Sequence, residues 1–310
     1  MKKILFASAL LAMTIGSCNS DPIENEQAPS TVDSLAVETH DSLATTTPML
    51  GEFVKIMIGS NKYQETIKFY EILGWEIEAQ NDEPWNWTSM YDGSMSLLIN
   101  EDTMNYMGPA YHSKDALNVY KTLKDMNIEP GMEMSGPDGT PWFNVYFSPD
   151  SLGFSIINEA HEVKEDIQIA DLIANPKEKL EFPNDKAGIF QEYAMAVENV
   201  DSSLAYYTAL GFESQGKHTE GVPYPYAIGY DGQLTLGMHE TRGMWSGQLF
   251  TYSGHSVERN DSVVEELKEN GFDNIEALEY GGQAFPGNYL ITDPAGNIFF
   301  LTTDFSAMKK

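Results

Sequence analysis

The stretch IKFYEILGWE, residues 67–76, has a near copy in LAYYTALGFE, residues 204–213. Both contain an aromatic pair followed by Leu-Gly-aromatic-Glu. Two further pairs of segments repeat in the same order: SMYDGSMSLLINED (89–102) with IGYDGQLTLGMHET (228–241), and FSPDSLGFSIIN (147–158) with ITDPAGNIFFLT (291–302). Three landmarks that keep their order and nearly their spacing indicate a duplication.

Each half has the same predicted order of elements. A strand leads to a helix that ends at Leu-Gly, and strands joined by an Asp-Gly turn follow; this turn favours a type I′ hairpin. A further strand, a second helix (ALNVYKTLKDMN or DSVVEELKENGF) and the closing hairpin complete the half. The sequence therefore predicts an α+β fold with four βαβββ units, in two domains at 51–160 and 188–310, each with its own core.

Residues 161–187 separate the two predicted domains. This segment is charged, contains Pro176 and Pro183, and holds at most one short amphipathic helix around DIQIADLI. We interpret it as an interdomain linker.

The N-terminal segment MKKILFASALLAMTIGSC is typical of an exported lipoprotein. Its apolar run from Ile4 to Ile15 is too short to span a bilayer and follows two lysines. Ile15-Gly16-Ser17-Cys18 resembles the lipobox of bacterial lipoproteins, which implies a signal peptide at 1–17 and a lipidated Cys18. Because Cys18 is the only cysteine, a disulfide within one chain is impossible. We expect a lipid-anchored protein of the bacterial cell envelope, at the outer membrane or its periplasmic face.

Residues 18–50 form the predicted tether between this anchor and the first domain. Positions 19–50 contain acidic residues but no basic or aromatic ones, so the segment cannot bury enough apolar surface to fold. The whole chain has a formal charge of −29, which argues against binding to nucleic acid.

The motifs VENVDSSLAYYTALGF (197–212) and DPAGNIFFL (293–301) resemble the vicinal oxygen chelate superfamily. This superfamily includes glyoxalase I, bleomycin-resistance proteins, fosfomycin-resistance enzymes and extradiol dioxygenases. The resemblance covers nearly everything after the tether. It implies that paired βαβββ units form curled sheets around a cup, and that metal enzymes of the family carry His, Gln or Glu ligands on strand positions facing into it.

The resemblance places the four ligand positions of the second half at Glu192, Gly237, Tyr252 and Phe300. Those of the first half fall at Phe53, Leu98, Gly108 and Ile157. A single carboxylate does not hold a catalytic metal ion, so we expect no divalent metal and no other cofactor. Bleomycin-resistance proteins enclose a ligand in the cup without metal.

Side chains two apart on a strand share a face, which extends these positions to candidate cup residues. His239 shares the face of Gly237, Phe250 that of Tyr252, Lys55 that of Phe53, and Asn100 that of Leu98. The candidate ligand-binding residues are Glu192, His239, Phe250, Tyr252, Phe300, Phe53, Lys55 and Asn100. Glu192 is also a candidate catalytic residue, because a Glu–His pair could act as a general base.

Three functions remain open. The chain is a tethered, metal-independent protein that binds a small hydrophobic or aromatic molecule; or an isomerase, lyase or dioxygenase of the superfamily whose metal site is displaced; or a scaffold with filled cups and partners on its acidic surface. We expect the first.

Overall fold

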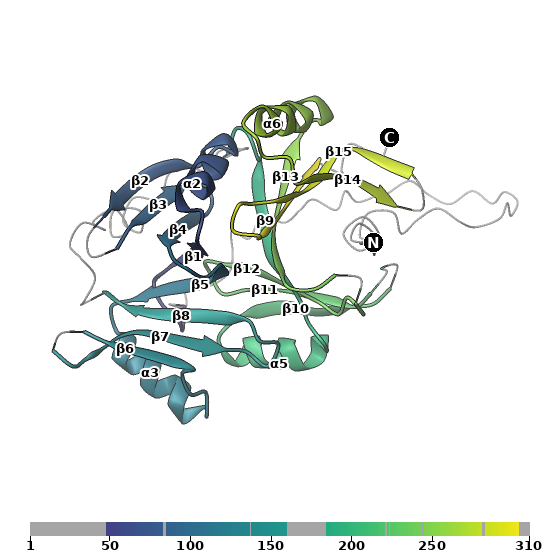
Figure 1. Ribbon diagram of the computed structural model, residues 1–310. Helices are drawn as coiled ribbons and strands as arrows, with labels where there is room; N and C mark the ends of the chain where they lie inside the picture. The colour runs from purple at the N-terminus through teal and green to yellow at the C-terminus, as the bar shows by residue number, and fades with distance from the viewer. Residues whose placement is uncertain are drawn as a thin grey trace, which may run out of the picture.

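The computed structural model describes residues 48–303, apart from 83–84, 137, 160–183, 221, 223, 244 and 281–282. Two mixed eight-stranded sheets and four helices make up this part of the chain (Figure 1). The predicted α+β fold with four βαβββ units is confirmed. The predicted signal peptide, Cys18, most of the tether and the linker helix lie outside the described residues.

The first half forms one sheet in the order β2-β3-β4-β1-β5-β8-β7-β6. Its elements are β1 (Phe53–Ser60), α2 (Tyr63–Ile72), β2 (Glu76–Asn81), β3 (Trp87–Tyr91), β4 (Ser96–Glu101), β5 (Tyr106–Ser113), α3 (Ala116–Asp125), β6 (Met132–Ser135), β7 (Pro141–Phe147) and β8 (Gly153–Asn158). The antiparallel β1–β5 pair at the centre joins the two units.

The second half repeats this topology in the order β10-β11-β12-β9-β13-β16-β15-β14. Its elements are β9 (Ile189–Ala196), α5 (Val200–Ala209), β10 (Glu213–His218), β11 (Tyr226–Tyr230), β12 (Thr235–His239), β13 (Gln248–His255), α6 (Val257–Glu269), β14 (Ile275–Tyr280), β15 (Gln283–Thr292) and β16 (Ile298–Thr303). Here the β9–β13 pair is central.

The Asp-Gly turns differ from the predicted type I′ hairpins. Residues 92–95 separate β3 from β4, and the Asp92 carboxylate accepts hydrogen bonds from the backbone N–H groups of Ser94 and Met95 at 2.8 and 2.6 Å. Gly93 has positive φ but Asp92 does not, whereas a type I′ turn needs it at both central positions. The aspartate side chain therefore caps a longer turn. Asp231 does the same for Gln233 and Leu234.

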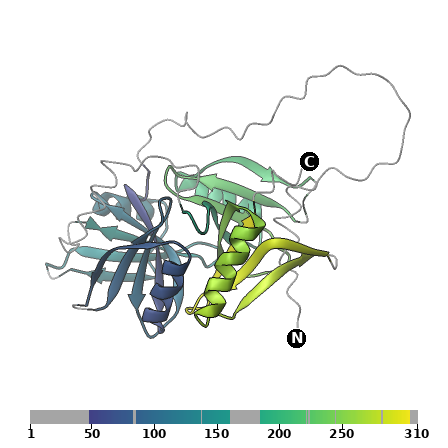
Figure 2. The same cartoon turned by 90° about the horizontal axis from the view of Figure 1, so that it is seen from above.

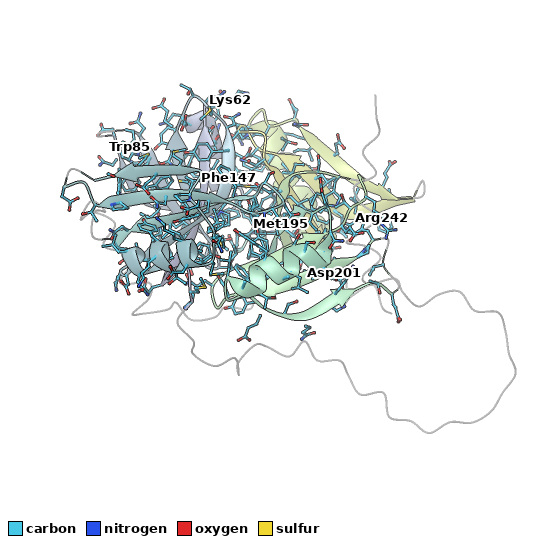
Figure 3. The ribbon with its side chains drawn as sticks, turned by 90° about the horizontal axis from the view of Figure 1, so that it is seen from below. Lys62, Trp85, Phe147, Met195, Asp201 and Arg242 are labelled. Atoms are coloured by element: carbon cyan, nitrogen blue, oxygen red, sulfur yellow. The ribbon has the colours of Figure 1, made fainter. Side chains whose placement is uncertain are left out.

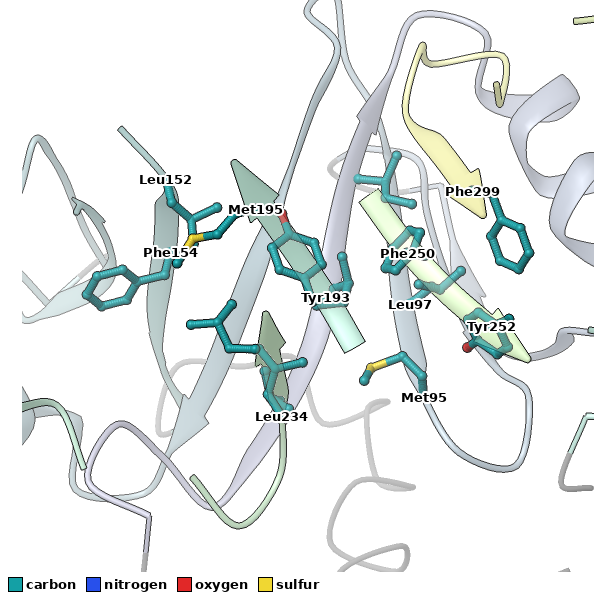
Figure 4. Packing of buried hydrophobic residues seen from close by; sticks show 14 of the residues in the cluster. Met95, Leu97, Leu152, Phe154, Tyr193, Met195, Leu234, Phe250, Tyr252 and Phe299 are labelled. Carbon is teal, nitrogen blue, oxygen red and sulfur yellow. The ribbon is translucent and has the colours of Figure 1, made fainter. Parts of the chain in front are cut away.

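The two halves share one hydrophobic core, so the prediction of separate cores is wrong. The cluster contains Ile56 and Phe69 from the first half together with Tyr193 and Phe250 from the second. Figure 4 shows side chains of both halves interleaved in it. Each sheet therefore has one face toward this shared core and an opposite face, which we call the cup face.

The repeated motifs meet one another across the boundary between the halves. The Tyr111 hydroxyl of β5 donates to Asp231 at 2.7 Å, and the Tyr252 hydroxyl of β13 donates to Asp92 at 2.7 Å. The Tyr70 hydroxyl of α2 donates to Asp293 in the closing turn at 2.9 Å. Helices α2 and α6, from different halves, lie side by side (Figures 1 and 2).

The ends of the predicted tether and linker belong to the folded part. Leu50, which we assigned to the tether, is 2 % exposed and joins the shared core. In the last residues of the linker, the Asn184 side chain donates to the carbonyl of Leu73 at 3.0 Å. The equivalent contact runs in the opposite direction: the Gln233 side chain of the second half donates to the carbonyl of Gly51 at 2.6 Å.

In the described residues, none of the helices is long and apolar enough to cross a membrane.

Candidate functional site

Strand register brings Glu192 and His239 to the same cup face of the second half. Glu192 on β9 pairs with Thr251 on β13, which pairs in turn with Phe300 on β16. On the other side, β12 pairs with β9 so that Gly237 lies beside Ala194 and His239 beside Ala196. Paired residues point to one face of a sheet, so these side chains converge over its centre.

Glu192 and His239 form a close buried pair. Glu192 is 6 % exposed and His239 is fully buried, and Nε2 of the histidine lies 3.2 Å from Oε1 of the glutamate. The distance suits a hydrogen bond, but the two groups are poorly aligned, and neither ring nitrogen of His239 has a hydrogen-bond partner among the described residues. We therefore treat the pair as a contact rather than a bond.

Gly237 makes room for this pair. A Cβ atom at this position would overlap Oε2 of Glu192 and lie 2.6 Å from Nε2 of His239. The backbone here has no positive φ that would call for glycine. The glycine is thus explained by space, since the carboxylate and the imidazole both lean over it.

Three aromatic rings enclose His239. Tyr226 stacks on it with centroids 5.7 Å apart, Tyr224 meets it edge-on at 5.9 Å, and Trp245 is tilted at 5.7 Å. The Trp245 Nε1–H donates to the Tyr224 hydroxyl at 2.8 Å, which fixes the two rings together. Burial raises the pKa of Tyr224 and Tyr226, and the charge of Glu192 raises both further. Both phenols therefore lie within electrostatic range of the carboxylate.

Thr251 completes the polar cluster and was missed by the sequence analysis. Its side chain is buried opposite Glu192, and its hydroxyl has no hydrogen-bond partner in the described part of the chain. Tyr224 and Trp245 were also missed. Both stand on segments between strands, where alternation along a strand gives no signal.

Tyr252 and Phe250 do not lie in the cup, and their prediction as cup residues is corrected. Both belong to the shared core; Tyr252 stacks on Phe299 at 4.9 Å and bonds to Asp92 (Figure 4). The pairing of β13 with β16 is irregular between Ser253 and His255, where β13 has one residue more than its partner strand. A slip of one residue moves every side chain to the other face, so counting back from the helix selected the wrong set.

Phe300 lies on the cup face, as predicted. It packs with Ala194, Tyr224, Trp245, Leu249 and Leu278 in a second hydrophobic cluster, separate from the shared core. These walls fill much of the cup with apolar and aromatic side chains.

In the first half, Phe53, Lys55 and Asn100 share the cup face, but they do not converge. Asn100 pairs with Gly59, four residues along β1 from Lys55, which separates their Cα atoms by about 13 Å. Lys55 is 1 % exposed. Trp85, 43 % exposed, has its ring 5.8 Å from that of Trp142. Figure 3 shows Trp85 of the first half and Arg242 of the second half on opposite sides of the view.

The residues of the second cup do not fit a catalytic metal ion. Such an ion needs at least three protein ligands and one open position. Glu192 and His239 could each supply one metal ligand, whereas Gly237 and Phe300 have no side-chain atom that could bind a metal. No group of three or more His, Cys, Asp or Glu side chains suited to a metal occurs in the described ranges.

A polar groove of about 440 Å³ lies elsewhere, between the start of α2 and the closing turn of the second half. Its lining includes Lys62, Glu65, Asp273 and Asp293. The buried carboxylate among these, Asp293, already accepts hydrogen bonds from Tyr70 and Asn297. The groove therefore offers no unpaired buried group that would select a ligand.

Comparison with known proteins shows the fold. No family model and no curated protein matches the chain. Homoprotocatechuate 2,3-dioxygenase from Arthrobacter globiformis matches over 83 % of this chain and 80 % of its own, with a TM-score of 0.52 and 14 % identity. A catechol 2,3-dioxygenase matches over 81 % and 90 %, with a TM-score of 0.50 and 10 % identity. The chain thus has the tandem fold of extradiol dioxygenases, as the resemblance predicted, and these identities carry no conclusion about activity.

Proposed function

We propose that the second half binds a small, mostly apolar molecule on its cup face, without a metal, through Glu192, His239 and Thr251. One observation supports this most strongly: His239 is fully buried beside a carboxylate, yet neither of its ring nitrogens has a hydrogen-bond partner among the described residues. Buried polar groups are nearly always paired, and leaving one unpaired costs about 1–3 kcal/mol. A ligand that pairs with these atoms recovers that cost.

The surroundings of the three polar groups support the same proposal. Phe300, Leu249, Trp245 and Tyr224 form apolar walls around them. Ligand sites in proteins typically combine such walls with a few converging polar groups. Since the walls pack closely, the ligand must be small, and Trp245 or Tyr224, which stand outside the strands, must move to admit it.

Mass spectrometry of small molecules that co-purify with the chain tests this proposal. We expect a bound molecule that is lost or reduced in Glu192→Gln and Thr251→Val. The matched control is Trp85→Ala in the first half, which should retain it. A molecule that stays bound to both second-cup variants, or the absence of any ligand in either cup, would contradict the proposal.

An enzyme of the superfamily is the second candidate. The contact between Glu192 and His239 supports it, because a buried carboxylate beside an imidazole can transfer protons. Metal analysis and a melting curve with a chelator separate the two candidates. We expect no stoichiometric divalent metal and no fall in melting temperature; a fall of several degrees would favour the enzyme with a displaced metal site.

If both cups hold no ligand and show no activity, the remaining candidate function is a scaffold that binds partner proteins on its acidic surface.

We further propose that the chain is anchored in the bacterial cell envelope by lipid on Cys18. The N-terminal sequence supports this, and the −29 charge disfavours adsorption to anionic lipid. Cys18→Ser should therefore release the protein from the membrane fraction or leave an unprocessed precursor. A processed Cys18→Ser protein that still sediments with membranes would contradict the anchor.

A further inference from the structure

We propose that the polar group recognised in the second cup is a primary ammonium group, attached to a small apolar or aromatic body. This inference rests on the proposed function and names the chemical class of its ligand. It follows from the number, type and charge of the unpaired groups on the cup face.

The site presents three acceptors, and a primary ammonium group presents three donors. Carboxylate oxygens only accept hydrogen bonds, a neutral imidazole accepts at one nitrogen, and a threonine hydroxyl can accept. Glu192, His239 and Thr251 supply one of each on a single face. In the described part of the chain, the ring nitrogens of His239 and the hydroxyl of Thr251 have no hydrogen-bond partner, and the nearest charged contact of the Glu192 carboxylate is His239 Nε2 at 3.2 Å.

Charge selects a cation over other donors. A buried carboxylate is costly unless a positive charge or several donors compensate it. A ligand hydroxyl offers a single donor and no charge, a carboxylate ligand would be repelled, and a quaternary ammonium group has no N–H to donate. A primary ammonium group meets both requirements. The net charge of −29 also raises the local concentration of cations around the protein.

The aromatic walls favour the same class. Tyr224 and Trp245 lie beside the imidazole at 5.9 and 5.7 Å, so a cation held between Glu192 and His239 is close to both rings. Aromatic rings attract cations within about 6 Å of the ring centroid. Phe300 and Leu249 then provide apolar surface for the rest of the molecule.

Calorimetric titration of the purified chain with four matched probes tests the inference. The probes are benzylammonium, benzyl alcohol, benzyltrimethylammonium and benzoate, which share one ring and differ in the polar group. We expect benzylammonium to bind at least tenfold more tightly than each of the others. Glu192→Gln should reduce this preference to within about threefold, which is the loss of about 0.7 kcal/mol or more of selectivity.

Two further variants distinguish recognition by the site's own groups from attraction of cations by the protein's overall negative charge. Glu213→Gln removes the same charge from an exposed position on β10 and should leave the preference unchanged. Thr251→Val removes one acceptor and should weaken benzylammonium several-fold while leaving benzyltrimethylammonium unaffected. If Glu192→Gln does not fold, Thr251→Val still decides the matter.

The outcomes distinguish this inference from the function on which it rests. Equal binding of benzylammonium and benzyl alcohol, both sensitive to Thr251→Val, would overturn the ammonium class and leave the small-molecule site standing. An equal effect of Glu213→Gln and Glu192→Gln would also overturn it. If no probe binds and no molecule co-purifies, the proposed function falls as well.

Discussion

Gly237 is the residue on which the geometry of the candidate site depends. Its missing side chain is what allows the Glu192 carboxylate and the His239 ring to occupy the same space over β12. Glycine in a strand interior weakens the strand and often marks a close approach of other groups. The strand is weakened here at a position where any side chain would displace both the carboxylate and the imidazole.

Gly237→Ala should therefore weaken ligand binding with little loss of stability. The new methyl group must push aside the flexible end of Glu192 and the His239 ring, so we expect at least a tenfold loss of affinity, about 1.4 kcal/mol. Gly229→Ala is the matched control, because its Cβ would lie 3.4 Å or more from its neighbours. Titration with the co-purifying ligand and melting curves measure the two effects. Unchanged binding in Gly237→Ala would remove the carboxylate and imidazole from the site.

Part of the candidate site could be predicted from the sequence. The resemblance to the superfamily placed Glu192 and Gly237 on the cup face, and alternation along the strand from Gly237 then predicted His239. Thr251 was missed because the extra residue of β13 between Ser253 and His255 puts the count back from the helix out by one position. Trp245 and Tyr224 reach the cup from outside the strands, so their place depends on the whole fold.

At the scale of elements, tyrosine–aspartate hydrogen bonds join the hairpins of one half to strands and helices of the other. Asp92 and Asp231 each cap their own turn with one oxygen and accept a tyrosine from the opposite half with the other. The Tyr-Asp-Gly motif therefore repeats because it serves both the turn and the boundary. The sequence showed the repeat but not this second role, because the partner tyrosines lie more than a hundred residues away.

Removing one of these hydroxyls should destabilise the protein. Tyr252→Phe leaves this Asp92 oxygen with the Asn184 amide, at 3.3 Å, as its one hydrogen-bond donor among the described residues, and we expect a loss of about 1–3 kcal/mol. Tyr206→Phe is the control, because the Tyr206 hydroxyl is buried without a hydrogen-bond partner in the described structure and its removal should be neutral or slightly stabilising. Urea unfolding of both variants tests the difference. Equal losses would mean that the Tyr252–Asp92 bond contributes nothing beyond packing.

The buried aspartates also give the boundary a pH dependence. Burial raises the pKa of Asp231, although hydrogen bonds from Leu234, Tyr111 and Gln233 oppose the rise. A pKa higher in the folded than in the unfolded state means that folding is favoured by protonation. This contribution is complete below the unfolded pKa, near 3.9, and is lost as pH rises through the folded value.

Asp231→Asn removes this titration and so changes the slope of stability with pH. As the pH falls from about 6 to about 4, we expect the parent chain to gain stability relative to the variant, by at most about 1.4 kcal/mol per pH unit. Urea midpoints measured on both proteins across this range provide the test. A parent chain that loses stability faster than the variant would reverse the assigned direction of the pKa.

At the scale of the whole molecule, the duplication predicted the topology but not how the halves combine. Repeated motifs specify each βαβββ unit through local turns, helix ends and apolar alternation, so both sheets could be predicted. The shared core could not be predicted, because an apolar strand or helix face has the same sequence pattern whether it packs within its own half or against the other half. Leu50 shows this: a single leucine after a polar tether is buried in the core cluster that both halves form.

A shared core should make the two halves unfold together. Separating them would expose Tyr193, Phe250 and Phe69 and would break the buried tyrosine–aspartate bonds at the boundary. Four of the five tryptophans lie in the first half and only Trp245 lies in the second, so Trp245→Phe leaves fluorescence that reports on the first half and its boundary alone. Far-ultraviolet circular dichroism reports on both sheets. In urea, the two signals of this variant should share one midpoint, the mark of a two-state transition. A circular-dichroism transition that precedes the fluorescence change would show that the second half unfolds independently, and the boundary contacts would then be too weak to couple the two sheets.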